Sequence, residues 1–434
     1  MLTDDPRPLC DGRRLLINPV IYFQPAKRGK FPAGAAIVVI KLYYVAHPTQ
    51  PNPCASMDPL RTSHPGRAGA SRRHFLKTAS LGLGATLAVP GLTRPVPAIP
   101  PRRDQEPLGM ALVGLGYYAT NQLAPALQQA QRCRLTGIVT GTPAKADAWS
   151  QQYAIPRSHI YSYETFDQIA ENPDIDIVYI VLPNGMHAEY TIRAAQAGKH
   201  VLCEKPMAVS VQECEAMIAA CREAGVKLSI GYRLHFEPHN REAMRLGQGQ
   251  VFGAVKVVEA SFGFRIGNPD QWRLDKELAG GGALMDVGIY AIQAARYVTG
   301  EEPLSVTAQE AKTDPVKFRE VDETLFWQLE FPSGAVAAST TTYAANVERL
   351  FATCERGWFE LGPAYGYDGQ RGRTSQGPMD FPIITEQTLQ MDDFVDCIVN
   401  DRPSEVSGEE GLRDMKIIEA IYRAAETGDK VMIA

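Results

Sequence analysis

Apolar and polar positions along residues 108–232 predict strands and helices in alternation. Short apolar runs that end in turn residues indicate buried parallel strands, and the stretches between them carry apolar residues at helical spacing. The predicted strands are Leu108–Val113, Leu135–Thr140, Ile175–Leu182, His200–Cys203 and Lys227–Tyr232, and the predicted helices are Ala119–Ala130, Pro143–Tyr153, His187–Ala197 and Ser210–Ala224. This alternation predicts an α/β domain built on a doubly wound parallel sheet.

From residue 233 onward the pattern changes to strands joined by turns that contain glycine or proline. Several of these strands alternate between polar and apolar positions, as strands with one buried face do. The expected strands are Ala254–Phe264, Leu304–Ala311, Thr324–Phe331, Ala335–Tyr343 and Leu350–Cys354, and the expected helices are Ala283–Val298, Thr388–Val399 and Glu409–Ala425. We therefore expect residues 233–434 to form an α+β domain with a large, mostly antiparallel open sheet. The last helix either stays in this domain or returns to the first.

Residues 1–107 show no sustained period and are rich in proline, so we expect a disordered leader. Within it, over about residues 71–98, Arg72 and Arg73 precede a short apolar stretch and a run of prolines. This arrangement predicts a secretory signal that resembles the twin-arginine type, which exports folded proteins, and hence a periplasmic protein. The alternative is a chance arginine pair before a glycine-rich linker. The sequence leaves the start (Met1 or Met57) and the cleavage site open.

Composition places the chain among soluble globular proteins, with 45% apolar and 21% charged residues in 434. The net charge of -5 and the lack of basic runs interleaved with aromatic residues argue against nucleic-acid binding. The eight cysteines form no C-x-x-C pair, which argues against a disulfide framework. The segment 235–239 begins and ends in histidine, but it is not H-E-x-x-H and Pro238 interrupts it, so we expect no metal site.

A glycine-rich turn lies directly between the first predicted strand and the first predicted helix. It consists of Gly114, Leu115, Gly116, Tyr117, Tyr118 and Ala119, which fit the pattern G-x-G-x-x-A. In this pattern the first glycine permits the tight turn, the second lets a pyrophosphate approach the backbone, and the small last residue lets helix and strand pack closely. Because strand, turn and helix follow in the required order, we predict a Rossmann dinucleotide-binding domain over 108–232 rather than an ordinary tight connection.

The end of the second predicted strand bears on which dinucleotide binds. NAD sites commonly place a carboxylate there to hold the ribose hydroxyls. Here the strand ends in Thr140 and Gly141, and Lys145 follows shortly after. A hydroxyl and an ammonium suit a 2′-phosphate, which a carboxylate would repel, so the sequence favours NADP over NAD.

Candidate chemical groups follow two further strands. Leu182, Asn184 and His187 come after one strand, and Glu204 and Lys205 end the next. Since the carboxyl ends of parallel strands border the ligand crevice of such a sheet, both groups should lie near the nicotinamide half of the cofactor. Asp286 and Tyr290 stand four residues apart on a predicted helix, so they can share one face.

Three segments, together with the glycine turn, resemble the Gfo/Idh/MocA oxidoreductases from residue 108 to the C-terminus. They are Glu204-Lys205-Pro206, Gly231-Tyr232-Arg233 and the stretch from Gly281 to Tyr290. The similarity is greatest to the glucose–fructose oxidoreductase branch. The resemblance implies that Lys205 lies beside the nicotinamide and the reacting sugar carbon. It also implies that Tyr232, Trp272 and Arg273 lie near the substrate or the nicotinamide.

The chain departs from the D-x-G-x-H pattern of most relatives, because Tyr290 stands where they have a histidine. A phenol is a weak base at neutral pH, and a neighbouring ammonium such as that of Lys205 favours its charged form. Asp286 would orient this pair or bind a sugar hydroxyl. Each residue also has a structural alternative: a surface lysine, a core tyrosine, a capping aspartate and, for His187, a helix-start residue.

The resemblance and the leader together predict an exported oxidoreductase with tightly bound NADP. It would oxidise an aldose at C1 to the lactone and pass the hydride to a second sugar, because the periplasm supplies no free NADP. Two alternatives remain: an aldose dehydrogenase or aldose–aldose oxidoreductase with the same site, and a non-catalytic NADP- or sugar-binding protein. We expect a homo-oligomer, dimer or tetramer, for which residues 304–354 could supply a face. The sequence does not identify the sugars.

Overall fold

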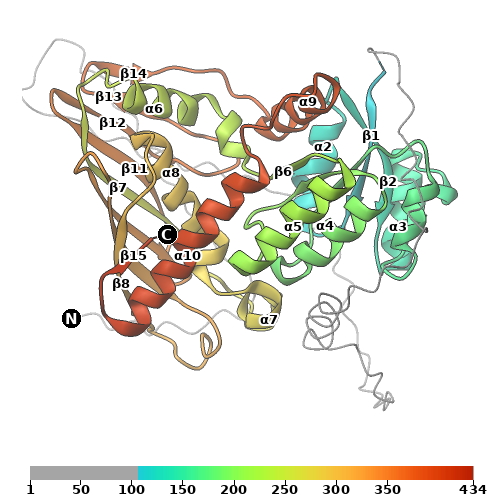
Figure 1. The fold of residues 1–434 in the computed structure, drawn as a ribbon, viewed down its shortest axis with the longest axis horizontal. Helices are drawn as coiled ribbons and strands as arrows, with labels where there is room; N and C mark the ends of the chain where they lie inside the picture. The colour runs from blue at the N-terminus through green and yellow to red at the C-terminus, as the bar shows by residue number, and fades with distance from the viewer. Residues whose placement is uncertain (1–105, 434) are drawn as a thin grey trace, which may run out of the picture. The chain divides into compact units, whose positions relative to one another are not determined.

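The structure is a computed structural model that describes residues 106–433 (Figure 1). The predicted leader and its twin-arginine signal lie outside the described residues. The described residues form two sheets, one parallel with six strands and one mostly antiparallel with nine. Both the parallel sheet and the antiparallel one were predicted from the periodicity of the sequence, and both predictions are confirmed.

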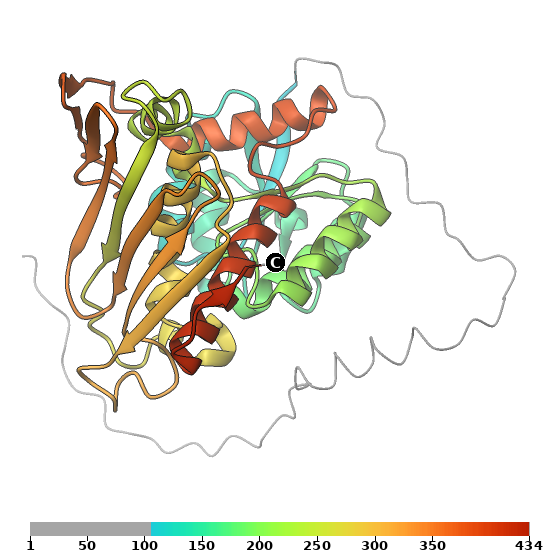
Figure 2. The same cartoon turned by 60° about the vertical axis from the view of Figure 1, so that its left-hand side comes forward.

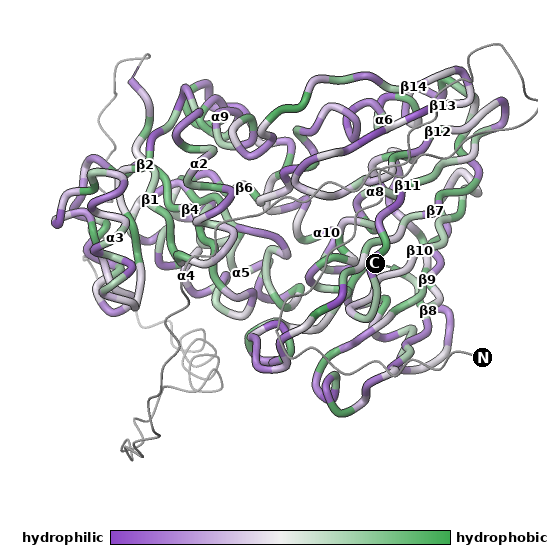
Figure 3. Tube along the Cα trace, turned by 180° about the vertical axis from the view of Figure 1, so that it is seen from behind, coloured by the Kyte–Doolittle hydropathy of each residue, from purple (hydrophilic) through white to green (hydrophobic). Residues whose placement is uncertain are grey.

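The parallel sheet has the strand order β3-β2-β1-β4-β5-β6. Its strands are β1 (Leu108–Val113), β2 (Cys133–Val139), β3 (Ile160–Tyr161), β4 (Ile177–Ile180), β5 (His200–Cys203) and β6 (Leu228–Ile230). All six residues of β1 are buried, and Figure 3 shows β1 and β4 as hydrophobic stretches of the chain. The strand order reverses between β1 and β4, which is where open α/β sheets bind ligands at the carboxyl ends of their strands.

Helices cover both faces of this sheet. They are α2 (Ala124–Leu127), α3 (Pro143–Tyr153), α4 (His187–Gln196), α5 (Val211–Ala224) and α9 (Glu386–Val399). Successive residues of β1 point to opposite faces, so Leu112 packs in a cluster with Trp149 of α3 and Phe394 of α9, whereas Val113 packs in the cluster that contains Ala194 of α4. The sheet is therefore buried on both sides, as its continuous apolar strands require.

The first predicted helix, Ala119–Ala130, differs in the structure. It begins with a π-helical turn at Ala119–Leu123, and the α-helical part, α2, ends at Leu127. Pro125 has no N–H to donate back to the preceding turn, which accounts for the wider hydrogen bonding at this point. The helix still begins directly after the glycine turn, where its first N–H groups face the crevice.

The second sheet has the order β14-β13-β12-β11-β7-β10-β9-β8-β15, in which only the β7–β10 pair is parallel. Its strands are β7 (Val255–Gly263), β8 (Ser305–Ala311), β9 (Thr324–Glu330), β10 (Val336–Thr342), β11 (Val347–Cys354), β12 (Gly357–Leu361), β13 (Gly372–Thr374), β14 (Gly377–Met379) and β15 (Val431–Met432). The helices α6 (Pro238–Gln248) and α8 (Ile289–Thr299) pack beside each other, and α8 packs on β7. The segment Lys276–Thr299, long and apolar enough to cross a membrane, is mostly buried in this core.

The last two helices contact both halves of the protein. The final helix, α10 (Gly408–Thr427), lies between α5 of the first sheet and β8 of the second (Figure 2). The helix before it, α9, packs on the first domain through Met391, Phe394 and Val395. The C-terminal region therefore joins the two sheets, and the crevice between them is held by packed helices.

Candidate active site

The glycine turn after β1 has the geometry that a pyrophosphate requires. Gly114 has φ +93°, and a Cβ there would lie 2.5 Å from the backbone oxygen of Val181. A Cβ at Gly116 would meet no atom within 4 Å, so the space beside this residue is open. Open space beside Gly116 and the N–H groups of the following helix fit a bound pyrophosphate. Leu115 is buried within the turn, whereas Tyr117 is 72% exposed.

The residues predicted to distinguish NADP from NAD gather at this turn. The Lys145 ammonium donates a hydrogen bond of 2.9 Å to the backbone oxygen of Leu115. Thr140 is buried and its Oγ1 accepts a hydrogen bond of 3.2 Å from the N–H of Thr142. A Cβ at Gly141 would lie 3.1 Å from the ring of Tyr163. The structure thus places a cation, the Lys145 ammonium, beside the glycine turn and shortly after the end of β2.

Lys205 connects the parallel sheet to the second domain. It follows β5, and its Nζ donates a hydrogen bond of 2.7 Å to the backbone oxygen of Asp286. The same Nζ lies 3.6 Å from Asp286 Oδ1 and 4.8 Å from the ring centre of Tyr290. One ammonium therefore contacts both Asp286 and Tyr290, which were predicted to share a helix face. Lys205 precedes them in the chain by 81 positions or more.

The carboxylate of Asp286 is held by two further groups. Arg273 Nε and the Tyr343 hydroxyl each donate a hydrogen bond of 2.9 Å to Oδ2. Burial disfavours the charged carboxylate, but the cations of Arg273 and Lys205 outweigh this effect and lower the pKa of Asp286. Asp286 is therefore ionised at neutral pH. The guanidinium of Arg273 also lies 4.6 Å from the ring centre of Trp272, which places this predicted residue at the same site.

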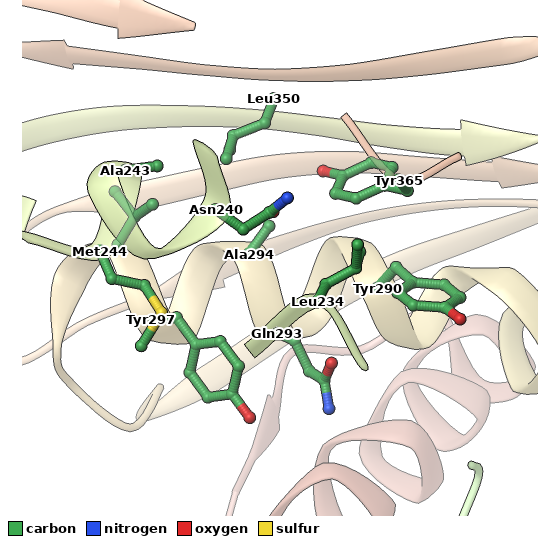
Figure 4. Close-up of a pocket in the computed structure, with 11 residues that line it drawn as sticks. Leu234, Asn240, Ala243, Met244, Tyr290, Gln293, Ala294, Tyr297, Leu350 and Tyr365 are labelled. Atoms are coloured by element: carbon green, nitrogen blue, oxygen red, sulfur yellow. The ribbon is translucent and has the colours of Figure 1, made fainter. Parts of the chain in front are cut away.

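Tyr290 is 5% exposed and has aromatic neighbours on two sides. Phe262 meets its ring edge-on at 5.5 Å, and Tyr365 stacks on it at 6.1 Å. A cavity of about 20 Å³ lies behind it, lined by Asn240, Leu350 and neighbouring residues (Figure 4). The cavity has room for one or two water molecules only. The Tyr290 hydroxyl points away from the cavity in Figure 4, and the Lys205 ammonium lies over the Tyr290 ring.

The segment that carries Asp286 is a π-helical turn, Leu284–Gly288, fixed by a residue that the sequence pattern did not indicate. Asp322 accepts hydrogen bonds from the N–H groups of Gly282 (2.6 Å) and Leu284 (2.8 Å) and from the Tyr422 hydroxyl (2.7 Å). A Cβ at Gly282 would lie 1.9 Å from the backbone oxygen of Asp322. Gly282 is thus required for the close approach of this segment to the backbone of Asp322.

The Glu204 side chain contacts the backbone of Lys205. Its Oε1 accepts a hydrogen bond of 2.6 Å from the Tyr179 hydroxyl, and its Oε2 accepts one of 3.3 Å from the N–H of Lys205. A Cβ at Gly231 would lie 2.5 Å from Oε1, which explains why a glycine follows β6 here. Burial raises the pKa of Glu204. In this geometry the side chain fixes the backbone of the catalytic candidate.

Two residues that were predicted to contact the cofactor or the substrate, His187 and Tyr232, are buried next to the site. His187 is fully buried, with Nδ1 2.9 Å from the Pro206 oxygen and Nε2 2.8 Å from the Leu182 oxygen. Tyr232 is 1% exposed, and burial and the nearby carboxylate of Asp414 raise its pKa. Neither side chain offers surface for direct contact with a ligand; His187 instead ties together the loops after β4 and β5.

Asn184 has a similar supporting contact, because its Nδ2 donates a hydrogen bond of 2.8 Å to the backbone oxygen of Ala279. This bond joins the loop after β4 to the helix α7 (Lys276–Ala279), which precedes the glycines before Asp286. Leu182 is buried in the same loop. The Asn184 bond thus fixes the loop after β4 against the segment that leads to Asp286.

An open glycine turn, a cation shortly after β2 and a lysine that contacts the second domain fit a nicotinamide-dependent oxidoreductase. Residues 108–232 match the oxidoreductase family with an NAD-binding Rossmann fold. Residues 240–360 match the Gfo/Idh/MocA C-terminal domain, and residues 369–433 match the C-terminal α/β domain of the oxidoreductase family. The chain belongs to the Gfo/Idh/MocA family, as the sequence motifs predicted.

Curated relatives and a solved structure share most of the chain. It is 33% identical over 339 residues to the D-xylose 1-dehydrogenase [NADP(+)] of Haloarcula marismortui, covering 75% of this chain and 93% of the relative. It is 31% identical to D-xylose 1-dehydrogenase (NADP(+)) 2 of Haloferax volcanii, covering 74% and 98%. The aldose-aldose oxidoreductase of Caulobacter crescentus, crystallised with glycerol, is 48% identical with a TM-score of 0.74, covering 75% of this chain and all of that one.

Proposed function

We propose that the protein is an NADP-containing sugar oxidoreductase that oxidises an aldose at C1 to the lactone and passes the hydride to a second sugar. The observation that carries this proposal is the Lys205 ammonium, which contacts both Asp286 and Tyr290 at the carboxyl end of β5. The names of relatives support the substrate class: two are NADP-dependent D-xylose 1-dehydrogenases and one is an aldose–aldose oxidoreductase.

The residues of the chain divide the chemistry between them. Tyr290 takes the proton of the C1 hydroxyl, and Lys205 donates a hydrogen bond to the oxygen on which negative charge develops. When bound, NADP would supply the hydride acceptor for the oxidation at C1 and the hydride donor for the second sugar. The C1–O single bond then becomes the carbonyl of the lactone. Asp286, kept ionised by Arg273, holds the Lys205 ammonium in place.

The glycine turn and the end of β2 would hold the cofactor. Gly114, Leu115 and Gly116 fit the pyrophosphate, and Lys145 with Thr140 fits the 2′-phosphate of NADP. The walls near Lys205, which Asn184 and Leu182 help to form, fit the nicotinamide half. We further propose that NADP is bound tightly and exported with the folded protein through the twin-arginine machinery, because a periplasmic enzyme cannot draw on free NADP.

Oligomerisation through the second sheet is part of the proposal. Phe326 and Val257 are large apolar side chains exposed on strands of this sheet, at 48% and 37%. Apolar exposure of this kind on a sheet face favours association into a dimer or tetramer. Sedimentation measurements at several protein concentrations test this association. A protein that stays monomeric at all of them would contradict it.

Two other functions use the same geometry. An NADP-dependent aldose dehydrogenase would release its reduced cofactor, and an aldose–aldose oxidoreductase would use another aldose as acceptor. The relatives' names support both. A non-catalytic NADP- or sugar-binding protein is disfavoured, because the Lys205–Asp286 contact and the buried Tyr290 are both in place.

Product analysis with a panel of sugars tests the proposal. The purified protein is incubated with pairs of sugars that include glucose, xylose and fructose, with and without added NADP. We expect a lactone from one sugar and an alditol from the other in equal amounts without added NADP. Lactone formed only with stoichiometric added NADP would favour the dehydrogenase, and no lactone under either condition would reject the catalytic proposal.

A further inference from the structure

A second buried cation, Arg233, lies against Tyr290. Arg233 begins the short helical turn Arg233–Phe236, which two residues separate from the end of β6, and is 2% exposed. Its Nη1 donates hydrogen bonds to Glu386 Oε1 (2.6 Å) and to the backbone oxygen of Gly366 (2.8 Å), and its Nη2 donates one to the backbone oxygen of Tyr365. One guanidinium thus joins the end of the parallel sheet, the start of α9 and the loop after β12.

The position of the guanidinium relative to the aromatic rings bears on the chemistry. Its central carbon lies 5.4 Å from the ring centre of Tyr290 and 4.5 Å from that of Tyr367. With Lys205 Nζ at 4.8 Å, two cations therefore flank the Tyr290 ring. Burial opposes the charge on Arg233, yet the phenol of Tyr290 and the carboxylate of Glu386 raise the pKa of Arg233.

We propose that Arg233 is a positioning residue that stabilises the charged form of Tyr290 during proton transfer, and that Glu386 limits this effect by partly neutralising Arg233. This inference rests on the proposed function of Tyr290. A phenol becomes a stronger acid beside a cation, and the attraction is large where water is excluded. Lys205 is hydrogen-bonded to Asp286, whereas Arg233 has one unpaired buried N–H group, Nε, in addition to its bonds to Glu386 and the loop.

Other ionisable groups also surround Tyr290 and must stay unchanged in the test. They are Lys205 at the end of β5, Asp286 on the π-helical turn, Glu204 beside Lys205, Tyr118 on the helix after the glycine turn, and Tyr365 and Tyr367 on the loop after β12. The two tyrosines Tyr118 and Tyr367 contact each other at 5.7 Å. Only Arg233 and its partner Glu386 are altered below, so a shift is attributable to this pair.

The experiment measures aldose oxidation by the holoenzyme with added NADP as a function of pH. The double variant Arg233→Met/Glu386→Gln removes both charges and leaves neither partner buried alone, which favours folding. We expect the rising limb of the rate, the pH range over which the rate increases, to move by about one unit toward higher pH. Arg233→Lys, which retains the cation, should keep the limb near its original position.

The single variant Glu386→Gln separates an electrostatic role from a structural one. Removing the carboxylate leaves the Arg233 charge uncompensated. The rising limb should therefore move toward lower pH, which is the opposite of the shift expected for the double variant. Loss of loop support alone would lower the rate at all pH values without moving the limb. An unmoved limb in the folded double variant, or an upward shift in Glu386→Gln, overturns the inference.

A matched control replaces a buried ion pair elsewhere. Arg296 on α8 is also buried and pairs with Asp414 (2.6 Å), Glu410 (2.7 Å) and Glu302 (2.7 Å), and Arg296→Met/Asp414→Asn should leave the limb unmoved. Failure of the inference and failure of the proposed function are distinguishable. Activity in Tyr290→Phe would reject Tyr290 as the base, whereas an inactive Tyr290→Phe with an unmoved limb in the Arg233 variants rejects only the role of Arg233.

Discussion

The ammonium of Lys205, at the end of a strand of the parallel sheet, donates a 2.7 Å hydrogen bond to the backbone oxygen of Asp286 in the second domain. The bond brings together a lysine that follows the cofactor-binding strands and the helix that carries Tyr290. Because the backbone oxygen rather than the carboxylate is the nearer acceptor, the carboxylate remains available to Arg273 and Tyr343. The Lys205 ammonium thus connects the two domains, and the proposed chemistry takes place beside it.

Replacement of Tyr290 by phenylalanine should abolish turnover. The ring and its aromatic packing remain, but the hydroxyl that would take the C1 proton is lost, which typically costs a factor of about 10²–10⁴ in rate. Bound NADP should be retained in stoichiometric amount, because the residues proposed to hold its pyrophosphate and 2′-phosphate lie on the other domain. Reaction rate and nucleotide content of the purified variant are the measurements. An active Tyr290→Phe protein would transfer the acid–base role to another group.

The two glycines of the turn should respond differently to alanine. At Gly116 the added methyl meets no protein atom within 4 Å, so the thermal stability of the nucleotide-free protein should be unchanged while NADP affinity falls by about a hundredfold or more. At Gly114, φ +93° and a 2.5 Å approach to the Val181 oxygen should cost about 2 kcal/mol or more of stability. Melting curves and nucleotide titrations distinguish the two outcomes. Full NADP affinity in Gly116→Ala would mean that the pyrophosphate lies elsewhere.

Cofactor preference should depend on the end of β2. Thr140→Asp introduces a carboxylate that repels a 2′-phosphate, so the ratio of NADP to NAD affinity should fall by about tenfold or more. Lys145→Met removes the ammonium beside Leu115 and should weaken NADP by a similar factor while leaving NAD affinity unchanged. Titration of each variant with both nucleotides tests this. Unchanged NADP affinity in both variants would remove the basis for assigning NADP to this strand end.

Stability should depend on pH through Asp414, which accepts hydrogen bonds from Gln293 and Arg296 in the interior. Burial raises the pKa of Asp414 to about 6, above the reference value of about 4 in an unfolded chain. The folded state therefore binds this proton more tightly, and the charged carboxylate costs about 3 kcal/mol above pH 6, a cost that is lost as the pH falls toward 4. The melting temperature of the wild type should rise relative to that of Asp414→Asn when the pH is lowered from 7 to 5. Parallel pH profiles for the two proteins would contradict this.

The sequence predicted those elements whose periodicity is strong. The helix predicted over Ser210–Ala224 is present as α5, and Ser210 Oγ accepts a 3.2 Å hydrogen bond from the Glu213 N–H at its start. The strand β3 was missed because it has only two residues, Ile160 and Tyr161, which is too short for any period. The π-helical turns were missed as well, since hydrophobic spacing does not distinguish a wider turn from a regular one.

Long-range contacts account for the rest of the site. Lys205, Asp286 and Tyr290 were found from local motifs, and the structure brings them together. Asp322 and Tyr343 carry no motif, and their roles depend on tertiary contacts that place them against Gly282 and Asp286. His187 gave a clear signal as a helix-start residue at a strand end, but burial against two backbone oxygens decides that it supports the site from behind.

The spectrum of the purified protein, without added nicotinamide, tests the central claim most directly. An aldose such as glucose or xylose is added first, and a second sugar is added after the absorbance has become constant. We expect the absorbance of reduced nicotinamide to appear, to at most one equivalent of the bound NADP, and then to disappear with the second sugar. Bound nucleotide that no aldose reduces would contradict the claim that this site transfers hydride from sugars.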